Sequence, residues 1–171
     1  DMVWVKTRSI SSNHNLFDQV RGISAGRLVP NATNAEVSGG ISAYNSDGWE
    51  YDTGLENFNQ SSTTYVGWAW DAGTSTVTNT DGSITSQVRA NPSTGFSVTS
   101  YVGTGSNATV GHGLNSAVEL LIVKSRNNSR EWNVYHSGLT GATHFLRLHS
   151  TAAEESKSGK WNSTAPTSSV F

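Results

Sequence analysis

The first part of this chain is repeated near its end, and the repeat limits the fold more than any other feature of the sequence. All matching segments share one offset, so that no gap is needed over about three dozen residues. The matching pairs are Asp1–Ser9 with Glu119–Asn127, Leu16–Phe17 with Val134–Tyr135, and Asn31–Glu36 with His149–Glu154. Repetition at a fixed period predicts repeated structural units, and duplicated units of this kind usually present surfaces rather than two active sites.

The composition predicts an all-β protein. Hydrophobic residues make up 35% of the chain and charged residues 14%, and Ser, Thr, Asn and Gly supply much of the rest. Six Trp, five Tyr and five Phe at separated positions provide large surfaces to bury, which argues against disorder. Short strands joined by polar turns are the structure that such a composition favours.

Charge and composition also exclude several classes of partner. A formal net charge of −2 leaves no basic stripe, so nucleic acid is not an expected partner. No apolar run approaches the length that crosses a bilayer, so we expect no membrane insertion. There is no Cys, and therefore no disulfide framework. The chain opens at Asp1 in what reads as the middle of a strand, and we expect these residues to be a segment of a longer polypeptide.

The repeat predicts two incomplete modules in tandem. We place the C-terminal part of one β-sandwich module at residues 1–73, a linker at 74–82, and the N-terminal part of a second module at 83–171. The second copy stops near the equivalent of Trp49, if about four residues are inserted after Gly39, and so lacks a strand like Tyr65–Trp70. We predict that missing strands come from neighbouring repeats or by strand donation from another subunit. The alternative is that residues 83–117 complete the first copy.

Seven segments of the sequence match a known kind of module: Asp81–Val88, Gly95–Val98, Ala108–Leu114, Leu121–Arg126, Trp132–His136, Ser150–Ala153 and Trp161–Phe171. They resemble a module of large marine bacteriophage proteins, which look like tail, fibre or other virion-surface components. The resemblance covers nearly the whole chain and implies tandem concanavalin A-like (laminin G-like) jelly-roll sandwiches. It further implies a structural role in the virion, with binding of glycans on the host surface as an option, and it brings no catalytic residues.

Exposed aromatic rings are the candidates for glycan binding. Trp49, Tyr51 and Trp161 lie beside predicted turns and are the side chains that we expect to stack on a sugar. The other Trp residues lie in predicted strands and are better core residues, and they are Trp4, Trp68, Trp70 and Trp132. In Tyr65–Trp70, alternation places Trp68 and Trp70 on the face with Val66, which we predict to be an aromatic core face.

An enzyme and a metal protein are the less favoured alternatives. Glu50, Asp52 and Glu56 share strand parity and resemble the paired carboxylates of family 16 glucanases, where retaining hydrolysis needs two carboxyls about 5 Å apart. Gly54 disfavours a continuous strand there, and a solvated acidic edge is the favoured interpretation, so we predict no enzyme. No His spacing indicates zinc. Structural calcium at loop-end Asp residues stays open, although a role in turns is the favoured interpretation of these residues: Asp47, Asp71 and Asp81.

Two basic positions are repeated in both copies, as Lys6 with Lys124 and Arg8 with Arg126. We expect their stems to cover the edge of the core and their heads to pair with Asp18 or Glu36. The sequence as a whole therefore predicts an all-β, antiparallel jelly-roll or sandwich protein of the virion surface. Its expected partners are copies of itself or other virion proteins through β-strand addition, with host glycans as a further option and no cofactor.

Overall fold

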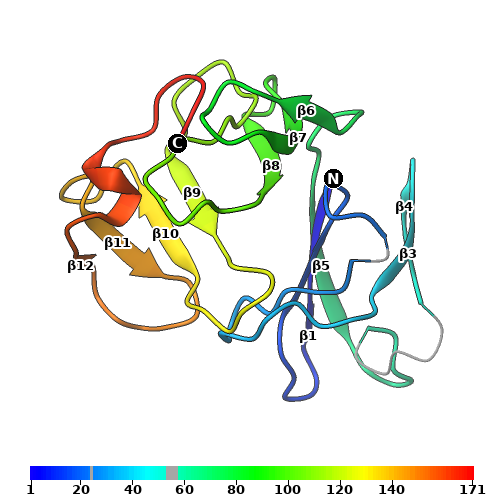
Figure 1. Cartoon of the computed structure of the whole chain (residues 1–171). Helices are drawn as coiled ribbons and strands as arrows, with labels where there is room; N and C mark the ends of the chain where they lie inside the picture. Colours follow the sequence, from blue (N-terminus) through cyan, green and yellow to red (C-terminus); the bar gives the residue numbers. More distant parts are fainter. Residues whose placement is uncertain (24, 53–57) are drawn as a thin grey trace.

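A computed structural model describes residues 1–23, 25–52 and 58–171, and it confirms the all-β sandwich fold. Twelve short strands and one 3-10 turn form the regular structure of these residues (Figure 1). The strands group into four small sheets, in which every pair of neighbouring strands is antiparallel. Two sheets come from the chain up to Trp70, and the other two come from the chain beyond it.

The first copy is a three-stranded sheet faced by a hairpin. The sheet has the order β2-β1-β5 and the hairpin pairs β3 with β4. Alternation in β1 turns Val3 and Val5 toward the hairpin, where each is 2% exposed and packs with Phe17, Ile41 and Phe58. The strands are β1 (Met2–Thr7), β2 (Asn15–Asp18), β3 (Ile41–Asn45), β4 (Gly48–Tyr51) and β5 (Tyr65–Trp70).

The second copy has a four-stranded sheet and, above it in Figure 1, a three-stranded sheet. The four-stranded sheet has the order β12-β11-β10-β9, and the other has the order β6-β7-β8. Its elements are β6 (Val77–Asn79), β7 (Ser86–Asn91), β8 (Phe96–Tyr101), β9 (Leu120–Val123), β10 (Asn133–His136), β11 (His144–Arg147), β12 (Glu155–Ser156) and the 3-10 turn η1 (Lys160–Ser163). Strand β6 thus lies inside the range 74–82 that the sequence analysis assigns to a linker.

The two copies have the same strand register, residue for residue. Every pair between β1 and β2 reappears between β9 and β10 after a shift of 118 residues, the separation of Asp1 and Glu119. The pairs Val3↔Phe17 and Leu121↔Tyr135 illustrate this correspondence. Because a slip of one residue would turn every side chain to the opposite face, a shared register means that both copies use the same inner and outer positions.

Side-chain contacts repeat along with the register. The Lys6 ammonium donates to the carbonyl of Thr7, and the Lys124 ammonium donates to the carbonyl of Ser125 at 2.7 Å. Both donor and acceptor are displaced by the same 118 residues. The heads of these two lysines therefore bind main-chain carbonyls in the following loop, and not the Asp18 or Glu36 carboxylates that the sequence analysis expects.

The β3–β4 turn is also repeated, with four residues inserted as the sequence predicts. Asn45 pairs with Gly48 in the first copy, and in the second the Thr167 amide donates to the Val170 carbonyl at 2.8 Å. Both positions are shifted by 122 residues, which makes Phe171 the counterpart of Trp49. Phe171 exchanges two main-chain hydrogen bonds with Val110. Residues 83–117 are therefore hydrogen-bonded to the second copy through Val110, and they also contact the end of β5, where Phe96 stacks on Trp70 with ring centroids 6.2 Å apart.

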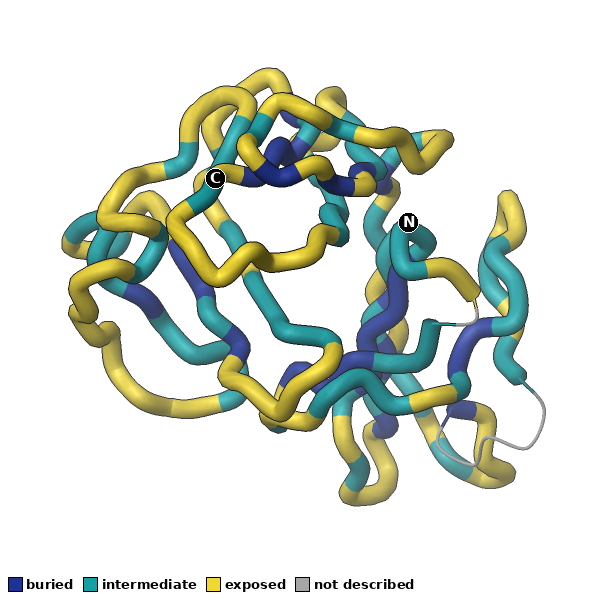
Figure 2. Tube along the Cα trace, viewed as in Figure 1, coloured by how far each residue is buried: buried dark blue, intermediate teal, exposed yellow. Residues whose placement is uncertain are grey.

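The copies differ at one edge of their central strands. β1 pairs with β2 on one side and β5 on the other, whereas β9 pairs with β10 and, in the described residues, with no strand on its other side. Figure 2 shows buried positions along β1, whereas the pattern of β9 alternates between exposed and intermediate positions. The predicted lack of a β5-like strand in the second copy is therefore a feature of the described structure.

The aromatic face predicted for β5 is not the core face. Trp68 is 45% exposed, and Trp4 and Trp70 are half-buried, whereas Trp132 is buried as predicted. The inner face of β5 carries Tyr65 and the small residues Gly67 and Ala69, because these are the residues opposite Thr7, Val5 and Val3. Alternation alone cannot tell which face is covered, and here the aromatic rings of the hairpin supply the inner bulk.

Gly40 tests the packing of the first core. A Cβ atom at this position would lie 2.2 Å from Cε1 of the buried Phe17 ring. We expect Gly40→Ala to lower the free energy of unfolding by about 1–3 kcal/mol, because the ring has to move within a filled core. Denaturant unfolding measures this loss. The control is Gly48→Ala on the same hairpin, where no heavy atom lies within 4 Å of the added carbon. Equal losses in the two variants would contradict the packing described here.

Candidate functional site

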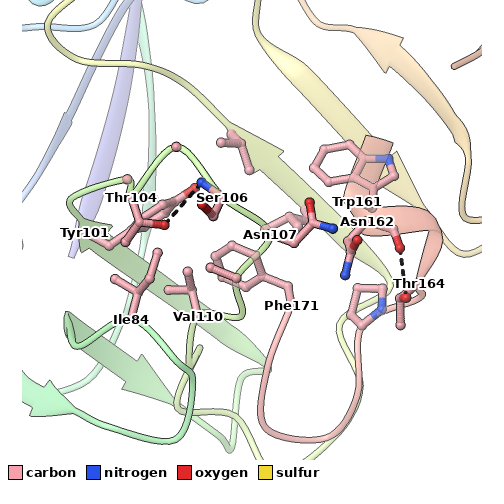
Figure 3. Close-up of a pocket in the computed structure, with 16 residues that line it drawn as sticks. Ile84, Tyr101, Thr104, Ser106, Asn107, Val110, Trp161, Asn162, Thr164 and Phe171 are labelled. Carbon is pink, nitrogen blue, oxygen red and sulfur yellow. Dashed lines mark hydrogen bonds between the residues drawn. The ribbon is translucent and has the colours of Figure 1, made fainter. Parts of the chain in front are cut away.

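A cavity of about 290 Å³ lies in the second copy. It lies between β9, the loop that follows β8, and the last residues of the chain (Figure 3). Its apolar wall consists of Ile84, Tyr101, Ala108, Val110, Leu121, Val123, Pro166 and Phe171. Hydroxyl and amide groups line the remaining wall, and they belong to Thr104, Ser106, Asn107, Asn162 and Thr164.

Trp161 is held on the wall of this cavity by an unusual stretch of backbone. Trp161, Asn162 and Ser163 have φ angles of 49°, 52° and 53°, in the left-handed region that residues with a side chain rarely adopt. The Trp161 indole donates to the His144 carbonyl at 3.0 Å and packs edge-on against Tyr135, with ring centroids 5.9 Å apart. These contacts fix the orientation of the ring, so its exposed part is presented to the cavity in a defined pose.

The cavity occupies the position at which the first copy has its core. Leu121 and Val123 on its wall are the counterparts of Val3 and Val5, which are buried by the hairpin and Phe58. Leu121 and Val123 are only half-buried. The inner face of β9 thus has apolar side chains at the same positions as β1, but these side chains are less buried than those of β1. Sequence reasoning did not identify this cavity, although the unmatched end of the repeat indicates its place.

The three predicted glycan-binding residues do not form one site. Trp49 and Tyr51 lie together on β4 with ring centroids 6.5 Å apart, and both pack on the first core. Tyr51 stacks on Phe58 at 5.4 Å, and burial raises the pKa of its hydroxyl. Trp161 belongs to η1 of the second copy and donates to the His144 carbonyl of β11. In Figure 1, η1 (red) lies on the opposite side of the molecule from β4. Any glycan site would therefore use either the β4 pair or Trp161.

The carboxylates that resemble a glucanase pair make different hydrogen bonds. Asp52 accepts a hydrogen bond from the amide of Gly40 at 2.9 Å, which closes the base of the β3–β4 hairpin. Glu50 is exposed and accepts from the Asn45 side chain at 2.9 Å. Glu56 lies outside the described residues. The role of Asp52 is thus structural in this arrangement, and Glu50 lies on the solvent side of β4.

The His and Asp side chains serve turns and loops. His112 is buried: its Nδ1 accepts from the Leu114 amide, and its Nε2 lies 3.2 Å from the Thr167 carbonyl. Asp71 accepts a hydrogen bond from the Gly73 amide, and Asp81 accepts one from the Asn79 side chain while its own main-chain amide donates to Asn79 Oδ1, as expected for turn residues. Within the described ranges, no three His, Asp or Glu side chains are placed to hold a metal ion. The same residues contain no helix long and apolar enough to cross a membrane.

The contact between the two copies, which we call the joint, is specific. The Glu36 carboxylate receives two hydrogen bonds from the Arg126 guanidinium, at 2.7 and 3.1 Å, and a third from Arg21 at 3.0 Å. Arg126 thus pairs with Glu36 as the sequence predicts, whereas its counterpart Arg8 is exposed. The Trp132 indole donates to the carbonyls of Val29 and Ala32, at 3.0 and 2.9 Å. Its ring fills an apolar cluster with Leu16 and Leu28 on the outer face of the first sheet.

Comparison with known families gives one match. A profile described as a domain of unknown function (DUF7483) matches residues 1–171. The chain belongs to the DUF7483 family. No curated protein and no solved structure matches it. The functional argument for this DUF7483 member therefore rests on the repeat, the joint, the unpaired edge of β9 and the cavity.

Glu36 makes the joint sensitive to acid. Burial by itself would raise the pKa of Glu36, but the hydrogen bonds and charges of Arg126 and Arg21 outweigh it and lower that pKa. The stabilisation is complete above the pKa of Glu in the unfolded chain, about 4.3, and is lost as the pH falls through the lower pKa of the folded state. We expect Glu36→Gln to lose about 1–3 kcal/mol at pH 7 and to show a weaker loss of stability between pH 6 and pH 3.

Thermal unfolding across this pH range measures both effects. Glu154→Gln is the matched control, since Glu154 is the counterpart of Glu36 in the second copy and is exposed. This control should stay within about 0.5 kcal/mol of the parent at pH 7. If the Glu36 variant keeps the full pH dependence of the parent, the ion pair does not stabilise the joint.

Proposed function

We propose that this DUF7483 chain is a structural component of a virion surface, such as a tail or fibre, in which β-sandwich modules join end to end. The observation that best supports this role is that two copies with the same strand register contact each other through the joint. Contacts between successive equivalent units are how repeat proteins build extended arrays, in which each unit is stabilised by its neighbours. The joint buries Trp132, and its ion pair includes Arg21, whose side chain is 4% exposed.

Each copy carries both charges of the Glu36–Arg126 pair, which supports continuation of the array, whereas the Trp of the joint is present in the second copy alone, since His14 stands at the position of Trp132. Arg126 of the second copy pairs with Glu36 of the first. The counterparts of these two residues are Arg8 in the first copy and Glu154 in the second, and both are exposed. A further module on either side would therefore meet a residue of the required charge. Such a head-to-tail contact uses two different surfaces, and contacts of this type extend into filaments when they do not close into a ring.

The proposed partners are copies of this chain or other proteins of the same particle, and the mechanism is assembly without bond chemistry. Strand addition and burial of apolar faces are its two components. The edge of β9 supplies the first, because its outward main-chain groups have no strand partner in the described residues. The second is supplied by surfaces such as the one that Trp132 covers.

Labelling of intact particles tests this function. Antibodies raised against the folded chain are bound to purified particles of the phage that encodes it and are located by gold labelling in the electron microscope. We expect labels on an external structure, with a repeat along its length if modules are in tandem. Particles washed at high salt should keep the label. Absence of the protein from purified particles, with recovery from the soluble lysate, would contradict a virion role.

Glycan binding is the second candidate, and the position of Trp161 favours it. Its fixed ring shares the cavity wall with the amide of Asn162 and the hydroxyl of Thr164, a combination that suits a sugar. Hydrolysis is the least favoured function, since Asp52 is bound to the Gly40 amide.

A glycan array with the parent chain, Trp161→Ala and Trp49→Ala tests this candidate. If the cavity binds a sugar, Trp161→Ala should lower the signal at least tenfold and Trp49→Ala should leave it unchanged. The reverse result would place the site at β4. A parent chain that binds no sugar on the array would exclude the glycan role and leave the structural one.

A further inference from the structure

A lysine amine and an asparagine carboxamide are held against each other in the second copy. Asn133 is the first residue of β10, and Lys160 is the first residue of η1. The Nζ atom of Lys160 donates a hydrogen bond to the Oδ1 atom of Asn133, and both residues are half-buried. The next residue of the turn, Trp161, is fixed to β11 through the His144 carbonyl. The amine therefore stays next to an amide carbon that it can attack.

We propose that Lys160 and Asn133 react in the folded chain to form an intramolecular isopeptide bond. The Nζ atom of Lys160 attacks Cγ of Asn133, so that a new C–N bond forms and the bond from Cγ to Nδ2 breaks. Nδ2 takes up the two protons that the lysine ammonium loses and leaves as an ammonium ion, so the step needs no oxidant and no further reactant. This bond goes beyond the proposed function, and all of its participants lie within residues 131–160.

The orientation of the carboxamide is set by a contact that both copies share. The Nδ2 atom of Asn133 donates to the main-chain carbonyl of Glu131 at 3.3 Å. In the first copy the Nδ2 atom of Asn15 donates to the carbonyl of Asn13, also at 3.3 Å. Both donor and acceptor are shifted by 118 residues. Because this hydrogen bond holds the nitrogen of Asn133, its carbonyl oxygen is turned to Lys160, and little freedom remains to be lost before the reaction.

The surroundings of Lys160 favour the neutral amine that the attack requires. The ring of Phe145, which is 2% exposed, lies 4.1 Å from Nζ and excludes water on that side. Burial is the largest effect on the pKa of Lys160 and lowers it, although the Glu131 carboxylate acts in the opposite direction. A lower pKa leaves a larger fraction of the amine with a free electron pair at neutral pH.

Glu131 supplies a carboxylate for the transfer of protons. It lies two residues before Asn133, so both side chains are on the same side of an extended chain. Its Oε1 accepts a hydrogen bond from Nε of Arg147 at 2.6 Å, and Arg147 is the residue that pairs with Asn133 between β10 and β11. The guanidinium thus keeps this carboxylate near the pair, where it can take a proton from the amine and return it to the leaving nitrogen.

The first copy has the carboxamide without the amine. Asn15 is 2% exposed and makes the same contact as Asn133. The position of Lys160 corresponds to Ser42 after a shift of 118 residues and to Ser38 after a shift of 122. Neither residue carries an amine, so we expect one isopeptide bond and the loss of one ammonia in each chain.

The bond would close a loop that contains β11 and β12. These strands form one side of the four-stranded sheet, next to β10. A covalent link between residues 133 and 160 restricts the unfolded chain and ties the end of this segment to the start of β10. The edge of the sheet could then separate from β10 only as a closed loop.

The mass of the intact, purified chain tests the proposal. We expect a mass lower than that of the sequence by about 17 Da, which is one ammonia. A trypsin digest should contain residues 131–147 joined to residues 158–171. Lys160→Arg keeps the charge without the amine and should restore the full mass. Lys157→Arg is the matched control, because Lys157 is an exposed lysine three residues away, and it should keep the loss.

A parent chain that keeps the full mass after prolonged incubation would overturn the proposal and show an ordinary hydrogen bond between Lys160 and Asn133. A loss of ammonia that persists in Lys160→Arg would also overturn it, because an asparagine that forms a succinimide releases ammonia as well. If Lys160→Arg does not fold, the digest of the parent decides, since a succinimide joins no peptides. Particle labelling is independent of this result, so either proposal can fail without the other.

Discussion

Main-chain hydrogen bonding along both edges of β1 is the interaction on which the first copy depends. A strand in the centre of a sheet needs a partner on each side, because each residue carries a donor and an acceptor that must be satisfied. β2 and β5 provide those partners for β1, and the alternation of β1 then sends Val3 and Val5 into the core. The same chain contains the control for this arrangement, since β9 has one of the two partners and shows a less buried inner face.

The asymmetry between the copies links the fold to the proposed role. Here the contact between the copies uses Trp132 and the Glu36–Arg126 pair, and the counterparts of the ion pair, Arg8 and Glu154, are exposed. A buried joint between equivalent units is what an extended array requires, since neighbouring units stabilise one another.

The repeat made a large part of the fold predictable from sequence. A strand pattern fixes its own register once one face is buried, so two segments with the same pattern are expected to pair alike, and β1–β2 and β9–β10 do. The turn before Phe171 was predictable for the same reason, as was the lack of a β5-like strand beside β9. The polar contacts of the loops depend on packing between distant segments, and so Lys6 and Lys124 bind carbonyls that charge pairing did not suggest.

The side of each strand that is covered was harder to predict. In β5 the Trp residues face outward, because the bulk of the inner face comes from Trp49 and not from β5 itself. One difference between the copies does indicate the joint in the sequence, because Trp132 occupies the position that His14 has in the first copy. A large aromatic at one position of an otherwise matched pair indicates a contact made by one copy alone, and the Trp132 indole reaches Val29 and Ala32.

Native-state hydrogen exchange of β1 and β9 tests the central claim most directly, because the two strands have the same register and differ in one edge. The account predicts that β1 amides directed toward β2 and toward β5 are both protected. In β9, amides directed toward β10 should be protected, whereas those directed to the open edge should exchange at least a hundredfold faster than their β1 counterparts, a factor that corresponds to about 2.8 kcal/mol of opening free energy. Equal protection at the two edges of β9 in the isolated chain would contradict the account.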